Sequence, residues 1–149
     1  KTYAPILFVI ASAVGFARVI TRLNVATAVS QLIMGSLHSK VVVLLVFNAI
    51  LLVVGMIMDT APAVLVFCPV MLPVVKALEV DPVHFGIIMV VNLAIGFVTP
   101  PMGVNLFVAS NLTKLPVMQI ARRAVPFIVA FLIALLFITF IPAISLALV

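Results

Sequence analysis

Charged side chains are scarce in this sequence. Only 7% of its 149 residues are charged, whereas 67% are hydrophobic. A soluble domain usually carries about 25% charged residues, because polar groups must cover the surface that faces water. This chain has too few of them to do so. We therefore expect lipid to cover much of its surface, which excludes a soluble globular domain.

Clusters of basic residues are also missing. The chain has eight Lys and Arg residues and a formal net charge of +5, but these residues are scattered through long apolar runs. Nucleic-acid binding needs basic residues gathered on one face. The scattered pattern is typical of flanks that meet lipid headgroups, and on the predicted topology the two sides of the membrane receive equal numbers, so charge leaves the orientation open.

Residue sets for catalysis or for metal binding are absent as well. The one cysteine, Cys68, cannot form an internal disulfide, and its apolar surroundings predict a small buried hydrophobe. His38 and His84 are far apart in the sequence and have no neighbouring metal ligands. No HExxH, phosphate-loop or Ser/His/Asp pattern occurs. The sequence therefore predicts that the chain is not an enzyme and needs no organic cofactor.

Long apolar runs are what the sequence does have, and a spanning helix needs about 20 such residues. They predict an all-α polytopic membrane protein with four parts: a transmembrane helix and an interfacial connector helix in 1–40, a helical hairpin in 41–79, a discontinuous helix in 80–113, and a C-terminal transmembrane helix in 114–149. A polar connection from Lys114 to Arg123 should precede the last helix. Because the chain begins at Lys1 without a signal-peptide pattern, we expect a fragment or a processed chain.

The apolar run 41–79 is interrupted once, by Gly55-Met-Ile-Met-Asp59-Thr60-Ala-Pro62. An aspartate inside a hydrophobic run is costly in lipid, which makes Asp59 a candidate for function. Pro62 suits the first turn of a helix, and Asp59 or Thr60 can cap it. One helix should therefore end near Met58 and the next begin near Ala61. The tip of this hairpin lies near 55–62, and the sequence leaves open whether the hairpin spans the membrane or is re-entrant.

A second interruption divides the apolar run that follows Asp81-Pro82, a dipeptide that should open a helix. Its centre contains Thr99-Pro100-Pro101 between two glycines, which a regular helix cannot accommodate. The residue before a proline is also pushed towards extended geometry. We expect the helix to break near 96–105. Backbone groups freed at membrane depth need protein, water or a bound ion as partners.

The two interruptions together predict a binding site. Discontinuous helices near the middle of the membrane are the usual construction of secondary-transporter sites, where half-helix amides suit anions and unwound carbonyls suit Na⁺. Side-chain oxygens of Thr60, Thr99 and Asn105 can complete a Na⁺ shell. Asn48 and Asn92 are interpreted instead as hydrogen bonders between helices.

The ordered motifs of this region resemble the large membrane subunit of tripartite ATP-independent periplasmic (TRAP) transporters. The motifs are Gly55-Met-Ile-Met-Asp-Thr-Ala-Pro, Cys68-Pro-Val-Met-Leu-Pro, Asp81-Pro-Val-His-Phe-Gly and Thr99-Pro-Pro-Met-Gly-Val-Asn-Leu-Phe. The similarity extends over nearly the whole chain and is most specific from Gly55 to Phe107. The family's large subunit is several times longer, and it is the C-terminal part that the chain resembles.

The resemblance implies an elevator-type transporter in the bacterial cytoplasmic membrane that imports organic acids such as dicarboxylates or sialic acids with a Na⁺ gradient. Its large subunit has two inverted repeats, each with a hairpin and a broken helix, and this chain would be the second repeat. Its partners would be the first repeat, a small membrane subunit and a periplasmic binding protein. The hairpin would then open from the periplasmic side, with Arg122 and Arg123 facing the cytoplasm.

The same resemblance assigns ion- or substrate-binding roles to residues of the hairpin tip and the break. They are Gly55, Asp59, Thr60, Pro62, Gly96, Thr99, Pro100, Met102, Gly103 and Asn105, with Na⁺ near Thr60, Thr99 and Met102. Half of such a site is not expected to transport alone. Two other functions stay open: a stand-alone Na⁺/carboxylate symporter without a periplasmic partner, and a membrane scaffold subunit that does not transport.

Overall fold

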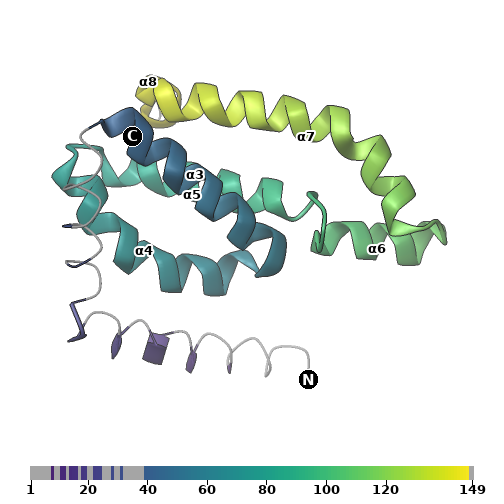
Figure 1. Cartoon of the computed structure of the whole chain (residues 1–149), viewed down its shortest axis with the longest axis horizontal. Helices are drawn as coiled ribbons and strands as arrows, with labels where there is room; N and C mark the ends of the chain where they lie inside the picture. The colour runs from purple at the N-terminus through teal and green to yellow at the C-terminus, as the bar shows by residue number, and fades with distance from the viewer. Residues whose placement is uncertain are drawn as a thin grey trace.

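The computed structural model describes residues 39–147 continuously, together with 8, 11–12, 14–16, 18–19, 22–24, 28 and 31. Throughout 39–147 every regular element is a helix, and three of these helices are long and apolar enough to cross a membrane. The predicted fold class, an all-α polytopic membrane protein, is thereby confirmed. The helices predicted within 1–40 fall mostly outside the described residues. Figure 1 shows the arrangement.

Helices α3 (Lys40–Ile57) and α4 (Thr60–Ala77) form a hairpin, and only Met58 and Asp59 separate them. α3 ends there because Met58 and Asp59 are both extended. Pro62 is the third residue of α4 and has no N–H to donate. No helical hydrogen bond is lost there, because the first one in α4 runs from the Ala63 amide to the Asp59 carbonyl oxygen. The two arms touch each other little, and α5 packs against both of them, chiefly against α3 (Figure 1).

Helices α5 (Pro82–Gly96) and α6 (Val104–Thr113) are the two parts of the discontinuous helix. Asp81 caps α5 with its side chain, which accepts hydrogen bonds from the amides of Val83 (2.7 Å) and His84 (3.2 Å). Neither part reaches the roughly 20 residues that a spanning helix requires. α6 lies beyond the end of α5, after an irregular segment from 97 to 103 (Figure 1).

The last helices differ from the prediction in two places. α7 runs from Val117 to Phe140, so the polar connection predicted to reach Arg123 ends at Pro116, which is extended and lets the helix begin at the next residue. Arg122 and Arg123 are exposed residues of α7 itself. The single last helix predicted to follow Arg123 is divided at Ile141, because Pro142 cannot continue the helix, and a short helix α8 (Pro142–Leu146) follows.

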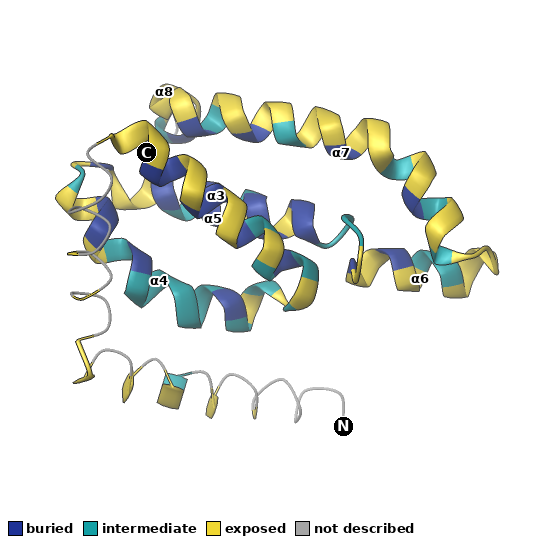
Figure 2. Ribbon diagram, viewed as in Figure 1, coloured by how far each residue is buried: buried dark blue, intermediate teal, exposed yellow. Residues whose placement is uncertain are grey.

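The core lies where α3, α4 and α5 meet. Phe47 and Phe85 form its centre, with ring centroids 5.9 Å apart and exposed fractions of 2% and 1%. Cys68, predicted to be buried, is half-buried at the edge of this core. Much of α7 is exposed (Figure 2), and its exposed residues include large apolar ones such as Phe127, Phe131 and Phe137. An exposed face of this composition suits contact with lipid, as the sequence predicted.

Candidate functional site

The hairpin tip and the helix break are brought together by two glycines. Gly55 in the last turn of α3 and Gly96 at the end of α5 touch through their backbones, and both are buried. A Cβ atom on Gly96 would lie 2.6 Å from the Gly55 Cα atom, and one on Gly55 would lie 2.8 Å from the Leu93 carbonyl oxygen. Only glycine permits this crossing. It fixes the end of α3 against the end of α5.

Asp59 organises the hairpin tip. It is the N-cap of α4, and its carboxylate accepts a hydrogen bond from the Thr60 amide at 2.6 Å. The Asp59 side chain is exposed and Thr60 is half-buried. The α4 N-terminus therefore carries a fixed negative charge beside amide groups that themselves favour negative charge. α3 ends on the other side of the same turn.

The break after Gly96 is closed by its own hydrogen bonds. The Thr99 amide bonds to the Gly96 carbonyl oxygen at 3.0 Å, and the Thr99 hydroxyl donates to the Ile95 carbonyl oxygen at 2.7 Å. Across the break, the Asn105 amide bonds to the Phe97 carbonyl oxygen at 3.1 Å. Pro100 and Pro101, joined by a cis peptide bond, have no N–H to offer these carbonyls. The segment thus holds a defined shape although it is not helical.

Gly103 is the residue that turns the chain into α6. Its φ of +24° lies in a region that side-chain-bearing residues rarely adopt. A Cβ atom there would also lie 2.9 Å from the Leu106 Cδ1 atom and 3.0 Å from the Thr99 carbonyl oxygen. Gly103 is buried, so its neighbours have little room to yield. The conformation of the break therefore depends on glycine at this position.

Backbone oxygens are left without partners on both sides of the glycine contact. The carbonyl groups of 55–58, at the end of α3, accept no hydrogen bond from any described residue, and within the described part of the chain the same holds for 98–102. The C-terminal ends of α3 and α5 add negative partial charge to this region, while the N-terminal ends of α4 and α6 add positive partial charge. Such an arrangement can bind a cation through oxygens and an anion through amides.

The predicted site residues thus fall into two groups that the contact between Gly55 and Gly96 joins. The tip contributes Asp59, Thr60 and Pro62, and the break contributes Thr99, Pro100, Met102, Gly103 and Asn105. Met102 and Asn105 are exposed. The steric role of the two contact glycines is evident from the structure, whereas the binding roles of the whole set stay a prediction.

A buried polar chain next to the site was only partly foreseen. The Asn92 Nδ2 atom donates to Asn48 Oδ1 at 2.8 Å, which confirms the predicted bond between helices. The Asn48 Nδ2 atom in turn donates to the Thr139 hydroxyl at 3.0 Å and ties α3 to α7. Thr139 and the buried His84, whose Nε2 atom lies 3.4 Å from the Thr139 carbonyl oxygen, were missed. Thr139 is a polar residue inside an apolar run, and this pattern could have identified it as a buried hydrogen bonder.

Comparisons with known proteins all point to one family. Residues 1–144 match the family described as the DctM component of the tripartite ATP-independent periplasmic transporter. The chain is 43% identical over 143 residues to the isethionate TRAP transporter permease protein DctMQ of Oleidesulfovibrio alaskensis, covering 96% of the chain and 22% of that protein. It is 40% identical to the C4-dicarboxylate TRAP transporter large permease protein DctM of Pseudomonas aeruginosa, covering 96% of the chain and 34% of that protein.

A third relative has a different named substrate. The 2,3-diketo-L-gulonate TRAP transporter large permease protein of Escherichia coli is 35% identical over 142 residues, which are 95% of the chain and 33% of that protein. The chain thus spans about a third or less of these relatives. All three are named as transporter permeases, which agrees with the prediction that the chain is not an enzyme and is a multi-pass protein of the cytoplasmic membrane. The chain belongs to the DctM family, the large permease component of TRAP transporters.

Proposed function

We propose that this chain forms one Na⁺-binding half of a permease that imports small organic acids. Na⁺ binds between the hairpin tip and the helix break, where oxygen atoms of Thr60, Thr99 and the neighbouring backbone can surround it. The observation that carries this proposal is the backbone contact of Gly55 with Gly96, which places the carbonyl ends of α3 and α5 side by side. A bound ion would then order both interruptions at once.

An anionic substrate is proposed to bind next to the ion. The N-termini of α4 and α6 begin at Thr60 and Val104, on the far sides of the same two interruptions, and helix N-termini favour anions. The names of the relatives support this class, because isethionate, C4-dicarboxylates and 2,3-diketo-L-gulonate are all small organic anions. A dicarboxylate or a sialic acid is the substrate type expected for this chain.

The proposed movement is of the elevator type. The hairpin, α5 and α6 would move as one body against a scaffold while ion and substrate are bound. This chain would be the second of two inverted repeats, and the C-terminal part of the permease. The first repeat, a small membrane subunit and a periplasmic binding protein that delivers the substrate would complete the transporter. The hairpin would open towards the periplasm.

The test is uptake of labelled organic acids into proteoliposomes that contain the full-length permease and its partners. Asp59→Asn keeps an oxygen that can cap α4 but removes the charge, and Thr99→Val removes one proposed Na⁺ ligand. Asp81→Asn is the matched control, because Asp81 caps α5 in the same manner at the opposite end of that helix. We expect Na⁺-dependent uptake to fall in both site variants and to persist in the control.

Each other outcome supports a different function. Na⁺-driven uptake without the periplasmic protein would favour a stand-alone Na⁺/carboxylate symporter. If no acid is taken up under a Na⁺ gradient although the proteins are folded, the proposal fails and the scaffold function replaces it. Equal losses in Asp59→Asn and Asp81→Asn would mean that the charge at the hairpin tip has no special role in uptake.

A further inference from the structure

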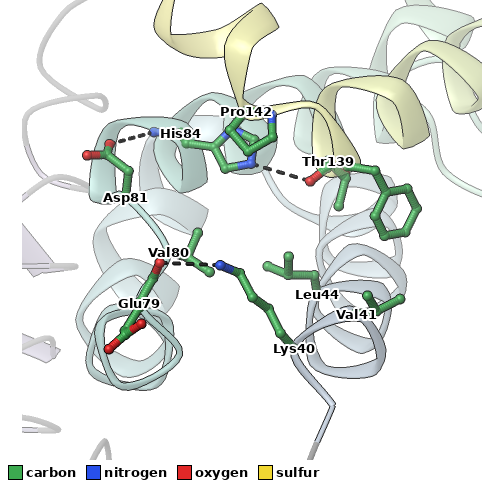
Figure 3. A pocket seen from close by; sticks show the side chains of 10 residues that line it. Lys40, Val41, Leu44, Glu79, Val80, Asp81, His84, Thr139 and Pro142 are labelled. Atoms are coloured by element: carbon green, nitrogen blue, oxygen red, sulfur yellow. Dashed lines mark hydrogen bonds between the residues drawn. The ribbon is translucent and has the colours of Figure 1, made fainter.

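A cavity lies at the end of the α3–α5 pair that is remote from the hairpin tip. Its volume is about 370 Å³, and it is lined by the first turns of α3 and α5, the loop between α4 and α5, and the end of α7 (Figure 3). Charged residues gather at this end, namely Lys40, Lys76, Glu79 and Asp81. Charges at the ends of spanning helices belong at the level of the lipid headgroups. We therefore place the cavity at headgroup depth.

His84 lines this cavity and has an unsatisfied acceptor buried in the cavity wall. The side chain is only 2% exposed, and its Nε2 atom lies 3.4 Å from the Thr139 carbonyl oxygen. Because a carbonyl oxygen only accepts, Nε2 must carry the proton, and in the neutral ring Nδ1 is then an acceptor. Nδ1 is buried and has no hydrogen-bond partner in the part of the chain that the structure describes. A buried acceptor without a donor is costly, so a ligand with an N–H or O–H group would be favoured here.

Lys40, in contrast, has unused hydrogen-bond donors and a positive charge. Its ammonium group donates one hydrogen bond, to the Glu79 carbonyl oxygen at 3.3 Å, and it has further donors available. In Figure 3 this ammonium extends from α3 across the cavity towards the loop. An anionic group of the ligand would be favoured at Lys40. Glu79 and Asp81 belong to the wall of the same cavity; their carboxylates point away from Lys40 in Figure 3, but their charges still favour a positive group close by.

These requirements describe a zwitterion in which a phosphate and a hydrogen-bearing ammonium are a few bonds apart. We propose that the cavity binds the headgroup of phosphatidylethanolamine, with its phosphate at Lys40 and its ammonium at His84 and the neighbouring carboxylates. Val41 and Phe140, which are apolar and exposed at the rim, would contact the acyl chains. Choline has no N–H donor, and phosphatidylglycerol brings a net negative charge to two carboxylates, so both should bind more weakly.

The test measures bound lipid and is independent of transport. The full-length permease with its partners is placed in nanodiscs of phosphatidylethanolamine, phosphatidylglycerol and phosphatidylcholine in equal amounts, then extracted, and retained lipid is identified by native mass spectrometry. We expect phosphatidylethanolamine to be enriched about tenfold over phosphatidylcholine. Lys40→Gln should lower the retention of both lipids by about tenfold, because both carry the phosphate whose charge-assisted hydrogen bond is lost. Lys40 is exposed, so the variant should fold.

Lys76→Gln is the matched control, because Lys76 has the same charge at the same end of the molecule but does not line the cavity. It should retain the lipid, and His84→Phe should lose the preference for ethanolamine over choline. Equal retention of the two lipids by the unmodified protein, or equal losses in the two lysine variants, would overturn the proposal. Binding of soluble glycerophosphoethanolamine to the delipidated permease as tight as that of phosphatidylethanolamine would show that a soluble compound, and not a lipid, is the ligand.

Discussion

α3 and α5 are joined in two different ways along their length. Near the hairpin tip, Gly55 and Gly96 touch backbone to backbone with no side chain between them. About one to two turns earlier, Asn48 and Asn92 meet through their side-chain amides, and Asn48 continues to Thr139 of α7. Both are known means of packing helices in lipid. The first leaves backbone oxygens nearby without partners, whereas the second uses most of its polar groups within the protein. We infer that the glycine contact serves binding and the amide chain serves stability.

The largest expected effect comes from filling the glycine contact. In Gly96→Ala the new methyl group meets the Gly55 backbone, which cannot rotate away, so we expect the free energy of unfolding to fall by about 2–3 kcal/mol. Unfolding of the full-length permease in mixed micelles measures this change. Gly86→Ala is the control in the same helix. A Cβ atom at Gly86 meets nothing within 4 Å, and alanine should stabilise α5 by about 0.5–1 kcal/mol.

The next effect concerns the amide chain. Asn92→Leu removes the donor to Asn48 at a fully buried position, and we expect a loss of about 1–2 kcal/mol in the same unfolding measurement. If the two regions have separate roles, the Na⁺ dependence of uptake should remain that of the unmodified protein. A shift in Na⁺ dependence as large as that of a tip variant would contradict the separation.

A smaller effect is expected at Gly103. Gly103→Ala forces a side chain onto a backbone with φ of +24°, which should cost about 1 kcal/mol. Because the strain falls on the break itself, uptake should decline more than this loss of stability explains. Uptake by Gly103→Ala is compared with uptake by Asn92→Leu under conditions in which the two variants have the same free energy of unfolding. This comparison separates the loss of stability from the change in the shape of the break. Equal uptake in the two variants would show that the shape of the break is unimportant.

The smallest effect on stability is expected for Asp59→Asn. Asparagine caps helices about as well as aspartate, so the free energy of unfolding should change by less than about 0.5 kcal/mol. The measurement is again unfolding in mixed micelles, with Asp81→Asn beside it. A loss well above this value would show that the Asp59 charge holds the tip together and is not available for binding.

Local chemistry made the helix ends predictable from the sequence. Asp59 and Pro62, Asp81 with Pro82, and the pair Pro100-Pro101 each dictate an end or a start within a few residues, and the structure has its helix ends there. Contacts between residues that are far apart in the sequence were harder to predict. The sequence marked Gly55 and Gly96 separately but did not show that they touch, because their meeting depends on how α3 crosses α5.

The same limit applies to α7 and its partners. Its start at Val117 was missed because Gln119, Arg122 and Arg123 made the segment read as a polar connection, although a helix tolerates exposed charges at its end. The bonds of Thr139 to Asn48 and His84 depend on α7 returning antiparallel along α3 and α5. Only the tertiary structure contains that information.

Na⁺ affinity of two threonine variants tests the central claim most directly. Thr99 and Thr113 each donate their hydroxyl proton to the carbonyl oxygen four residues earlier, both at 2.7 Å, but only Thr99 lies in the break. Binding of Na⁺ to the purified full-length permease, measured by calorimetry, should weaken about tenfold in Thr99→Val, equivalent to about 1.4 kcal/mol, and stay unchanged in Thr113→Val. Unchanged affinity in Thr99→Val, or equal weakening in both variants, would contradict a Na⁺ site between the hairpin tip and the helix break.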